Sequence, residues 1–118
     1  MPISKLAEAV SETQKDIAAS GIDGPILGHV GDGNFHAILL IDPENAEEMQ
    51  IAKDLAHRMS ERALAMGGTC TGEHGIGIGK RPLMAIEHSS AWGTMGAIKA
   101  ALDPQNIMNP GKLVPDRN

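Results

Sequence analysis

The chain has 118 residues, enough for one domain, or part of one, with a modest hydrophobic core. Its formal net charge is −5 at pH 7. No cluster of basic residues is larger than the pair Lys80-Arg81, which argues against a nucleic-acid partner. No apolar run approaches the roughly 18 residues that are needed to span a membrane. Cys70 is the single cysteine, which excludes an internal disulfide and is consistent with a protein of a reducing compartment. The simplest interpretation of Cys70 is a small buried residue.

The first predicted element is a helix over residues 3–20, whose face carries Ile3, Leu6, Val10 and Ile17. Gly21 follows this pattern as a stop. Residues 25–42 are rich in Ile and Leu and are interrupted by Asp32-Gly33, the strongest short signal for a β-hairpin. The sequence therefore predicts a helix followed by two antiparallel strands.

A second predicted helix opens at Asp42-Pro43 and ends at Gly67-Gly68, with Met, Ala and Leu recurring every three or four positions. Residues 67–80 hold six glycines in fourteen positions, which excludes a stable helix there. A third helix is predicted over about 89–102 and is closed by Asp103-Pro104. The remaining tail has the composition of an extended or looped segment.

Two histidines flank the turn in the stretch "GHVGDGNFH", residues 28–36. If Asp32-Gly33 forms a two-residue turn, His29 lies opposite His36 on one sheet face, with Cβ atoms about 4.5–5.5 Å apart. That separation suits two imidazoles that bind one ion at about 2.0–2.1 Å. Glycines surround the pair, as they do where another group approaches closely. The alternative, that each histidine is an ordinary strand residue, stays open without a third ligand.

The candidate third ligand is Glu73 in "TGEHGIG", where a glycine-rich loop can bend a carboxylate inward. Two histidines and one carboxylate leave open coordination positions, a set compatible with zinc, iron(II) or manganese. His74 is either a fourth ligand or a free base, and we favour the base because adjacent side chains rarely converge on one ion. In the competing interpretation, Glu73 is a solvent-facing residue of a capped loop.

Three motifs occur in order over nearly the whole chain: "GHVGDGNFH", "GTCTGEHGIGIGKRPLM" and "LDPQNIMNPGK". Together they resemble the C-terminal part of the FAD-linked oxidases of the vanillyl-alcohol-oxidase type. Within that family, the chain is most similar to cytochrome-type D-lactate dehydrogenases and the flavin subunit of glycolate oxidase. The resemblance implies an α+β fold, with an antiparallel sheet and helices on one face. It assigns residues 1–118 to the C-terminal part of the substrate or cap domain, with the FAD-binding domain absent.

The resemblance also implies roles for individual residues. In metal-containing members of the family, the residues that match His29, His36 and Glu73 bind a divalent ion that holds the substrate's hydroxyl and carboxylate. The residue that matches His74 removes the hydroxyl proton as hydride passes to the flavin. Asn109 is expected on the FAD side. The implied cofactors are FAD, bound mainly outside this segment, and a divalent metal: zinc, manganese or iron.

The implied function is a D-2-hydroxy-acid dehydrogenase of the D-lactate or glycolate type, which oxidises its substrate to a 2-oxo acid. The segment alone is expected to be inactive. Ile38 stands where relatives acting on 2-hydroxyglutarate carry Asn, which favours a small or apolar hydroxy acid. The implied partners are that acid, the FAD-binding domain and an electron-acceptor protein or quinone. The expected location is cytoplasmic, either free or peripheral to a membrane in the complete enzyme. Two alternatives remain: a free-standing metal-binding or scaffold module without redox activity, and a small zinc hydrolase with Glu73 as base.

Overall fold

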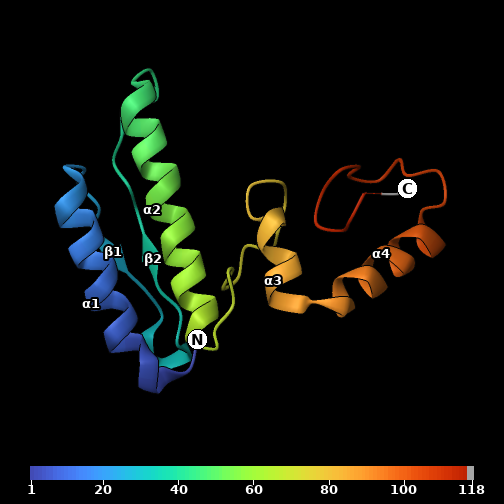
Figure 1. Cartoon of the computed structure of the whole chain (residues 1–118), viewed down its shortest axis with the longest axis horizontal. Coiled ribbons are helices and arrows are strands. Elements are labelled where there is room, and N and C mark those ends of the chain that lie inside the picture. Colours follow the sequence, from blue (N-terminus) through green and yellow to red (C-terminus); the bar gives the residue numbers. More distant parts are fainter. Residues whose placement is uncertain (117–118) are drawn as a thin grey trace. The chain divides into compact units, whose positions relative to one another are not determined.

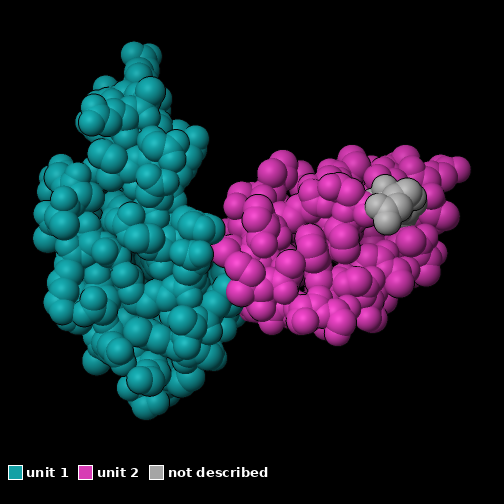
Figure 2. Space-filling model, viewed as in Figure 1, with its two compact units in different colours: residues 1–72 teal, residues 73–118 magenta. Residues whose placement is uncertain are grey.

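The computed structural model describes residues 1–116, so the last two residues of the predicted 1–118 segment lie outside the described part. The chain forms two compact units, unit 1 (Met1–Gly72) and unit 2 (Glu73–Asn118, described to residue 116), which Figure 2 distinguishes by colour. Unit 1 contains α1 (Ile3–Ser20), β1 (Ile26–Leu27), the 3₁₀ turn η1 (Val30–Asp32), β2 (His36–Ala37) and α2 (Ala46–Ala65). Unit 2 contains the 3₁₀ turn η2 (Arg81–Leu83), α3 (Met84–His88) and α4 (Ser90–Leu102).

Helix α1 begins and ends where the apolar periodicity predicts. Its C-cap is Gly21, which has a left-handed φ of 77°, the conformation that glycine adopts at least cost. Residue Ile3 of the predicted apolar face is 64% exposed, so the buried stripe starts one turn later at Leu6. The buried apolar residues of unit 1 come from both helices and from the segments beside them: Leu6, Ala9, Ile17, Ile22, Leu55 and Cys70.

Helix α2 begins at Ala46, three residues after the predicted opening at Asp42-Pro43. Asn45 is the N-cap, and its side-chain oxygen accepts hydrogen bonds from the backbone N–H groups of Glu47 and Glu48. The Glu48 carboxylate in turn accepts from the backbone N–H of Asp42. The true start is therefore set by the side chain that caps the helix.

The hairpin between the helices has a register that the turn signal did not predict. Leu27 pairs with His36 and Ile26 with Ala37, whereas a two-residue turn at Asp32-Gly33 would pair His29 with His36. The prediction is wrong because residues 30–32 form η1 and Gly33 closes it in the left-handed conformation. This compact turn lengthens the connection between the strands, which moves His36 two positions along its partner.

The hairpin lies against α1 and α2 (Figure 1). Its inner face carries Ala37 and Leu39, which line a small cavity together with Ile17 of α1 and Leu55 of α2. The opposite face carries Leu27, Ile38 and Leu40, which are 46–56% exposed. An antiparallel sheet with helices on one face is the α+β arrangement that the sequence predicts, and this prediction is confirmed.

In unit 2, residues 73–80 contain no helix, and neither do residues 67–72 at the end of unit 1, as their glycine content predicts. The predicted third helix is present as α4, but η2 and α3 were not predicted. Ser89, with φ of 50°, separates α3 from α4. The tail returns to these helices, since the Trp92 indole N–H donates to the carbonyl of Leu113 and the Arg81 Nε–H donates to that of Val114. No helix within residues 1–116 is long and apolar enough to cross a membrane.

Candidate metal and cofactor site

The two histidines lie at either end of the long hairpin connection. His29 is exposed and precedes η1, and its carbonyl accepts hydrogen bonds from the backbone N–H groups of Asp32 (2.9 Å) and Asn34 (3.3 Å). His36 is half-buried on β2. Their imidazole rings meet edge to face, with centroids 6.4 Å apart and planes at 86°. The rings are therefore neighbours although the two residues are not paired across the sheet.

The distance between these rings allows a test of the predicted metal pair. Two imidazole nitrogens that each lie about 2.0–2.1 Å from one tetrahedral ion place their ring centroids roughly 5 Å apart. The observed 6.4 Å exceeds this by roughly 1 Å, a distance that side-chain rotation of the exposed His29 can close. Histidine nitrogens are also ligands that zinc, iron and manganese sites use. The pair therefore fits a shared divalent ion.

The glycines around the pair make room for the chain itself. A Cβ atom at Gly28 would come within 2.5 Å of the Asn34 carbonyl oxygen, and one at Gly33 within 2.1 Å of the Met1 carbonyl oxygen. At Gly31, an added Cβ would meet no other described atom within 4 Å. At Gly28 and Gly33, the group that approaches closely is therefore the chain's own backbone. They allow close packing of the backbone that carries both histidines.

Glu73 and His74 are the first residues of unit 2, so the predicted ligands and base come from both units. The Glu73 side chain is 47% exposed and that of His74 is 81% exposed, and their nearest carboxylate oxygen and Nε2 atoms are 3.8 Å apart. The residue before them, Gly72, ends unit 1 and lies against the side chain of Asn34. The complete ligand set of His29, His36 and Glu73, with His74 as base, stays a prediction.

Ile38 follows β2 two residues after His36, so alternation along the strand places both on the same face of the hairpin. The side chain of Ile38 is 46% exposed, and its backbone N–H donates to the carbonyl of Pro25. Leu27, directly opposite His36, shares that face. The exposed surface beside His36 is thus apolar.

Asp103 organises the loop that leads to the predicted cofactor residue Asn109. Its buried carboxylate accepts hydrogen bonds from Lys99 Nζ and from the backbone N–H groups of Ile107 (3.1 Å) and Met108 (2.9 Å). The Lys99 hydrogen bond, followed by that of Met108, lowers the pKa of Asp103 from 3.8 to about 2. Sequence reasoning treated Asp103 only as a helix end, although a Lys four residues before an Asp was a readable signal for this pair.

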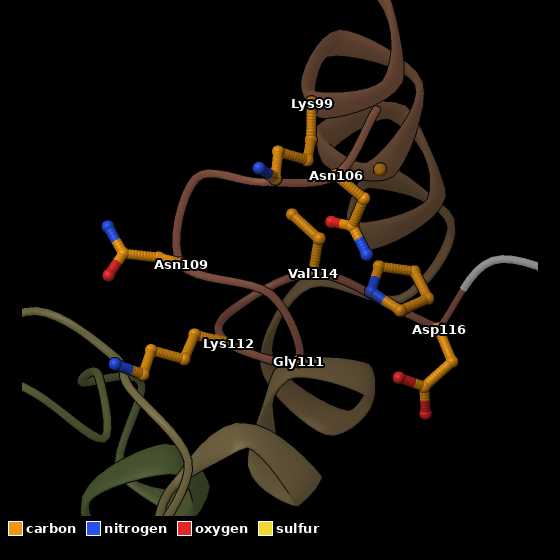
Figure 3. A pocket seen from close by; sticks show the side chains of 9 residues that line it. Lys99, Asn106, Asn109, Gly111, Lys112, Val114 and Asp116 are labelled. Carbon is orange, nitrogen blue, oxygen red and sulfur yellow. The ribbon is translucent and has the colours of Figure 1, made fainter. Parts of the chain in front are cut away.

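Asn109 follows this loop with a left-handed φ of 46° and is exposed. It lines a shallow pocket of unit 2, together with Lys99, Asn106 and Lys112. Figure 3 shows the Asn109 side chain directed away from Asn106 and Val114, toward solvent. An exposed amide held on a constrained loop is able to donate or accept hydrogen bonds to a group outside this segment.

The family model for the C-terminal domain of FAD linked oxidases matches residues 1–113, which include all five predicted site residues. The chain belongs to this family. The family prediction is confirmed, and the α+β fold seen here is that of a part of the FAD-linked oxidase C-terminal domain.

The curated relatives that this member of the FAD-linked oxidase family matches are longer proteins. A probable mitochondrial D-lactate dehydrogenase of Danio rerio is 50% identical over 115 residues, which cover 97% of this chain and 23% of the relative. A mitochondrial D-lactate dehydrogenase (cytochrome) of Arabidopsis thaliana is 47% identical over 98% of this chain and 20% of the relative. The glycolate oxidase subunit GlcD of Bacillus subtilis is 38% identical over 96% of this chain and 24% of the relative. The chain thus spans about a fifth to a quarter of the relatives it matches.

Proposed function

We propose that this chain is the C-terminal part of an FAD- and metal-dependent D-2-hydroxy-acid dehydrogenase of the D-lactate or glycolate type. The observation that carries the proposal is the family match over residues 1–113, because it includes both histidines, the Glu73-His74 pair and Asn109 in one segment. The names of the relatives, D-lactate dehydrogenase and glycolate oxidase subunit, support a 2-hydroxy acid as substrate. Oxidation of that acid gives a 2-oxo acid.

His29, His36 and Glu73 are the proposed ligands of one divalent ion. When bound, such an ion supplies positive charge that favours ionisation of a substrate hydroxyl. The neighbouring rings of His29 and His36 support the first two ligands. The apolar face formed by Leu27 and Ile38 beside His36 supports a substrate with a small or apolar side chain rather than a second carboxylate.

His74 is the proposed general base. Its imidazole would accept the proton of the substrate hydroxyl. FAD, when bound by the remainder of the enzyme, would supply the hydride acceptor. The 81% exposed ring of His74 leaves it accessible to a group outside this segment. Asn109 is proposed to face the FAD, which the remainder of the enzyme binds. The proposed electron acceptor is a protein or a quinone. The proposed location of the complete enzyme is cytoplasmic, either free or peripheral to a membrane.

The proposal can be tested by grafting this chain into a complete relative. The segment of the Arabidopsis thaliana protein that matches this chain is replaced by the chain, and D-lactate-dependent dye reduction is measured. We expect an active enzyme that loses about 10²–10⁴-fold in kcat on His74→Ala while retaining bound metal and FAD. Glu73→Ala should instead lose the metal.

The matched control is His57→Ala, because His57 is an exposed histidine on α2 outside the three motifs, 56% exposed and 3.4 Å from Glu61. This variant should keep the rate and the metal of the unmodified graft. A graft that folds and binds FAD but does not oxidise D-lactate or glycolate would contradict the proposal. A His74→Ala variant that loses its metal and recovers the full rate when metal is restored would reverse the roles of Glu73 and His74.

A further inference from the structure

The loop of residues 106–113 in unit 2 follows helix α4 and carries Asn109, the residue proposed to face the FAD. Three of its residues other than glycine have a left-handed φ: Asn106 (53°), Asn109 (46°) and Leu113 (62°). Residues other than glycine keep such conformations only where the surrounding structure fixes them. The loop therefore depends on anchors, and contacts within unit 2 supply them.

The end of this loop is anchored at Leu113. Its backbone N–H donates to the carbonyl of Gly77 (3.0 Å), and its own carbonyl accepts from the Trp92 indole N–H (2.8 Å). All three residues belong to unit 2. These contacts fix the point at which the chain leaves the loop.

The start of the loop is anchored by the Lys99–Asp103 pair at the end of α4. The Asp103 carboxylate accepts from the backbone N–H groups of Ile107 and Met108, and the Lys99 ammonium donates both to that carboxylate and to the Met108 carbonyl. The side chains of Lys99 and Asp103 are only 20% and 5% exposed. Figure 3 shows Lys99 extending from α4 toward the loop. The pair thus reaches beyond the helix and holds both backbone polar groups of Met108.

The Lys99 contact with Met108 bears directly on Asn109. The carbonyl of Met108 and the backbone N–H of Asn109 belong to one planar peptide group. A hydrogen bond to that carbonyl therefore fixes the plane from which the Cα atom and side chain of Asn109 project. Because the donor is an ammonium, this hydrogen bond is roughly twice as strong as one between neutral groups.

We propose that Lys99 and Asp103 are positioning residues for Asn109, because they hold the peptide group that joins Met108 to Asn109 and so present the Asn109 amide in one orientation. The inference rests on the proposed function, in which this amide faces the FAD. A loop that is already held in its binding conformation binds more tightly, since less order has to be gained on binding. Loss of the lysine should therefore loosen Asn109 and weaken FAD binding without removing the amide.

NMR relaxation of the Asn109 backbone amide in the 118-residue chain tests the positioning itself. We expect an order parameter near about 0.85, that of rigid backbone, in the wild type, and below about 0.6 in Lys99→Met, which removes the ammonium. Lys99→Arg, which retains charged donors, should restore most of the order. The matched control is Lys15→Met, because Lys15 pairs with Glu12 within α1 at 2.6 Å, and it should leave Asn109 unchanged. If Lys99→Met does not fold, Asp103→Asn carries the same test, since it keeps the size of the side chain. An order parameter of Asn109 that stays at the wild-type value would overturn the inference.

A double-mutant cycle in the graft into the Arabidopsis thaliana relative tests the consequence for FAD, by titration of the flavin-free protein with FAD. Asn109→Gly removes the amide and tolerates the left-handed φ. We expect Asn109→Gly and Lys99→Met each to weaken FAD binding about 2–10-fold, the effect of about one hydrogen bond. The double variant should be no weaker than the weaker single variant, because without the amide Lys99 has nothing to position.

The outcomes of this cycle separate the inference from the proposed function. A double variant whose loss is the product of the two single losses would overturn the inference, since Lys99 would then act on FAD binding independently of Asn109. Unchanged FAD affinity in Lys99→Met, beside weakened binding in Asn109→Gly, would also overturn it and would leave the proposed role of Asn109 in place. Unchanged affinity in Asn109→Gly would overturn that proposed role and this inference with it.

Discussion

Gly33 should be the least replaceable glycine of the hairpin connection, for two separable reasons. Its φ of 70° lies in the left-handed region, and a Cβ there would stand 2.1 Å from the carbonyl oxygen of Met1. Met1 is held at this point because its terminal ammonium donates to the Gly33 carbonyl at 2.9 Å. An alanine at position 33 therefore meets both backbone strain and a backbone atom that cannot rotate away.

Two other glycines of unit 1 separate the cost of backbone strain from the cost of the contact with Met1. Gly21 has a similar φ of 77° but no described atom within 4 Å of an added Cβ, so Gly21→Ala measures the backbone strain alone, about 1–2 kcal/mol. Gly31 has neither feature, so Gly31→Ala should be neutral or stabilise unit 1 by up to about 1 kcal/mol. Gly33→Ala adds an overpacking cost of about 1–3 kcal/mol to the strain, for a total of about 2–5 kcal/mol.

Urea unfolding of the three variants measures this series. The single tryptophan lies in unit 2, so unit 1 is followed by the amide NMR signals of α1. We expect the free energy of unfolding to decrease in the order Gly31→Ala, Gly21→Ala, Gly33→Ala. Equal losses in Gly21→Ala and Gly33→Ala would refute the contact between Met1 and the hairpin. A loss in Gly31→Ala as large as that in Gly21→Ala would refute the assignment of the cost to backbone conformation.

Two further predictions concern the Asp103 loop and the activity of the isolated chain. The Lys99 and Met108 hydrogen bonds lower the Asp103 pKa from 3.8 to about 2, so the stabilisation is complete above the unfolded value of 3.8 and is lost as the pH falls through 2. The Met108 amide chemical shift should titrate near pH 2 in the wild type and not in Asp103→Asn. The isolated, metal-loaded chain should not reduce a dye with D-lactate, since hydride transfer needs an acceptor held close to the substrate. A rate above the no-protein control would contradict this.

Helix α1, the end of α2 and helix α4 could be predicted from the sequence because their signals are local. Apolar residues three and four apart make a buried stripe, and glycine at position 21 or 67 ends the helix whatever lies elsewhere in the fold. The start of α2 was placed three residues early because the Asn45 cap competes with the Asp42-Pro43 signal. Both residue types open helices, and only the capping hydrogen bonds distinguish them.

The hairpin register could not be predicted because contacts distant in sequence decide it. Asp32-Gly33 is a strong turn signal, but the position of Gly33 is fixed by Met1, 32 residues away. The same applies to Asn34, whose neighbour Gly72 lies far along the chain. Residue type and spacing nonetheless indicated His29 and His36 as a metal pair, which stays a prediction, and the motifs indicated the family, which is confirmed. The edge-to-face geometry of the two histidines required the structure.

The most direct test of the central claim is a metal titration of the 118-residue chain and its single-site variants. We predict one Zn²⁺ or Mn²⁺ ion per chain, with about 2.7 kcal/mol of added stability when free metal is a hundredfold above Kd. Replacement of His29, His36 or Glu73 by alanine should abolish both effects, and His74→Ala should leave both unchanged. Equal melting of the wild type and His36→Ala in the presence of metal would contradict the site. Binding that survives His29→Ala but is lost in His74→Ala would contradict the assignment of ligand and base.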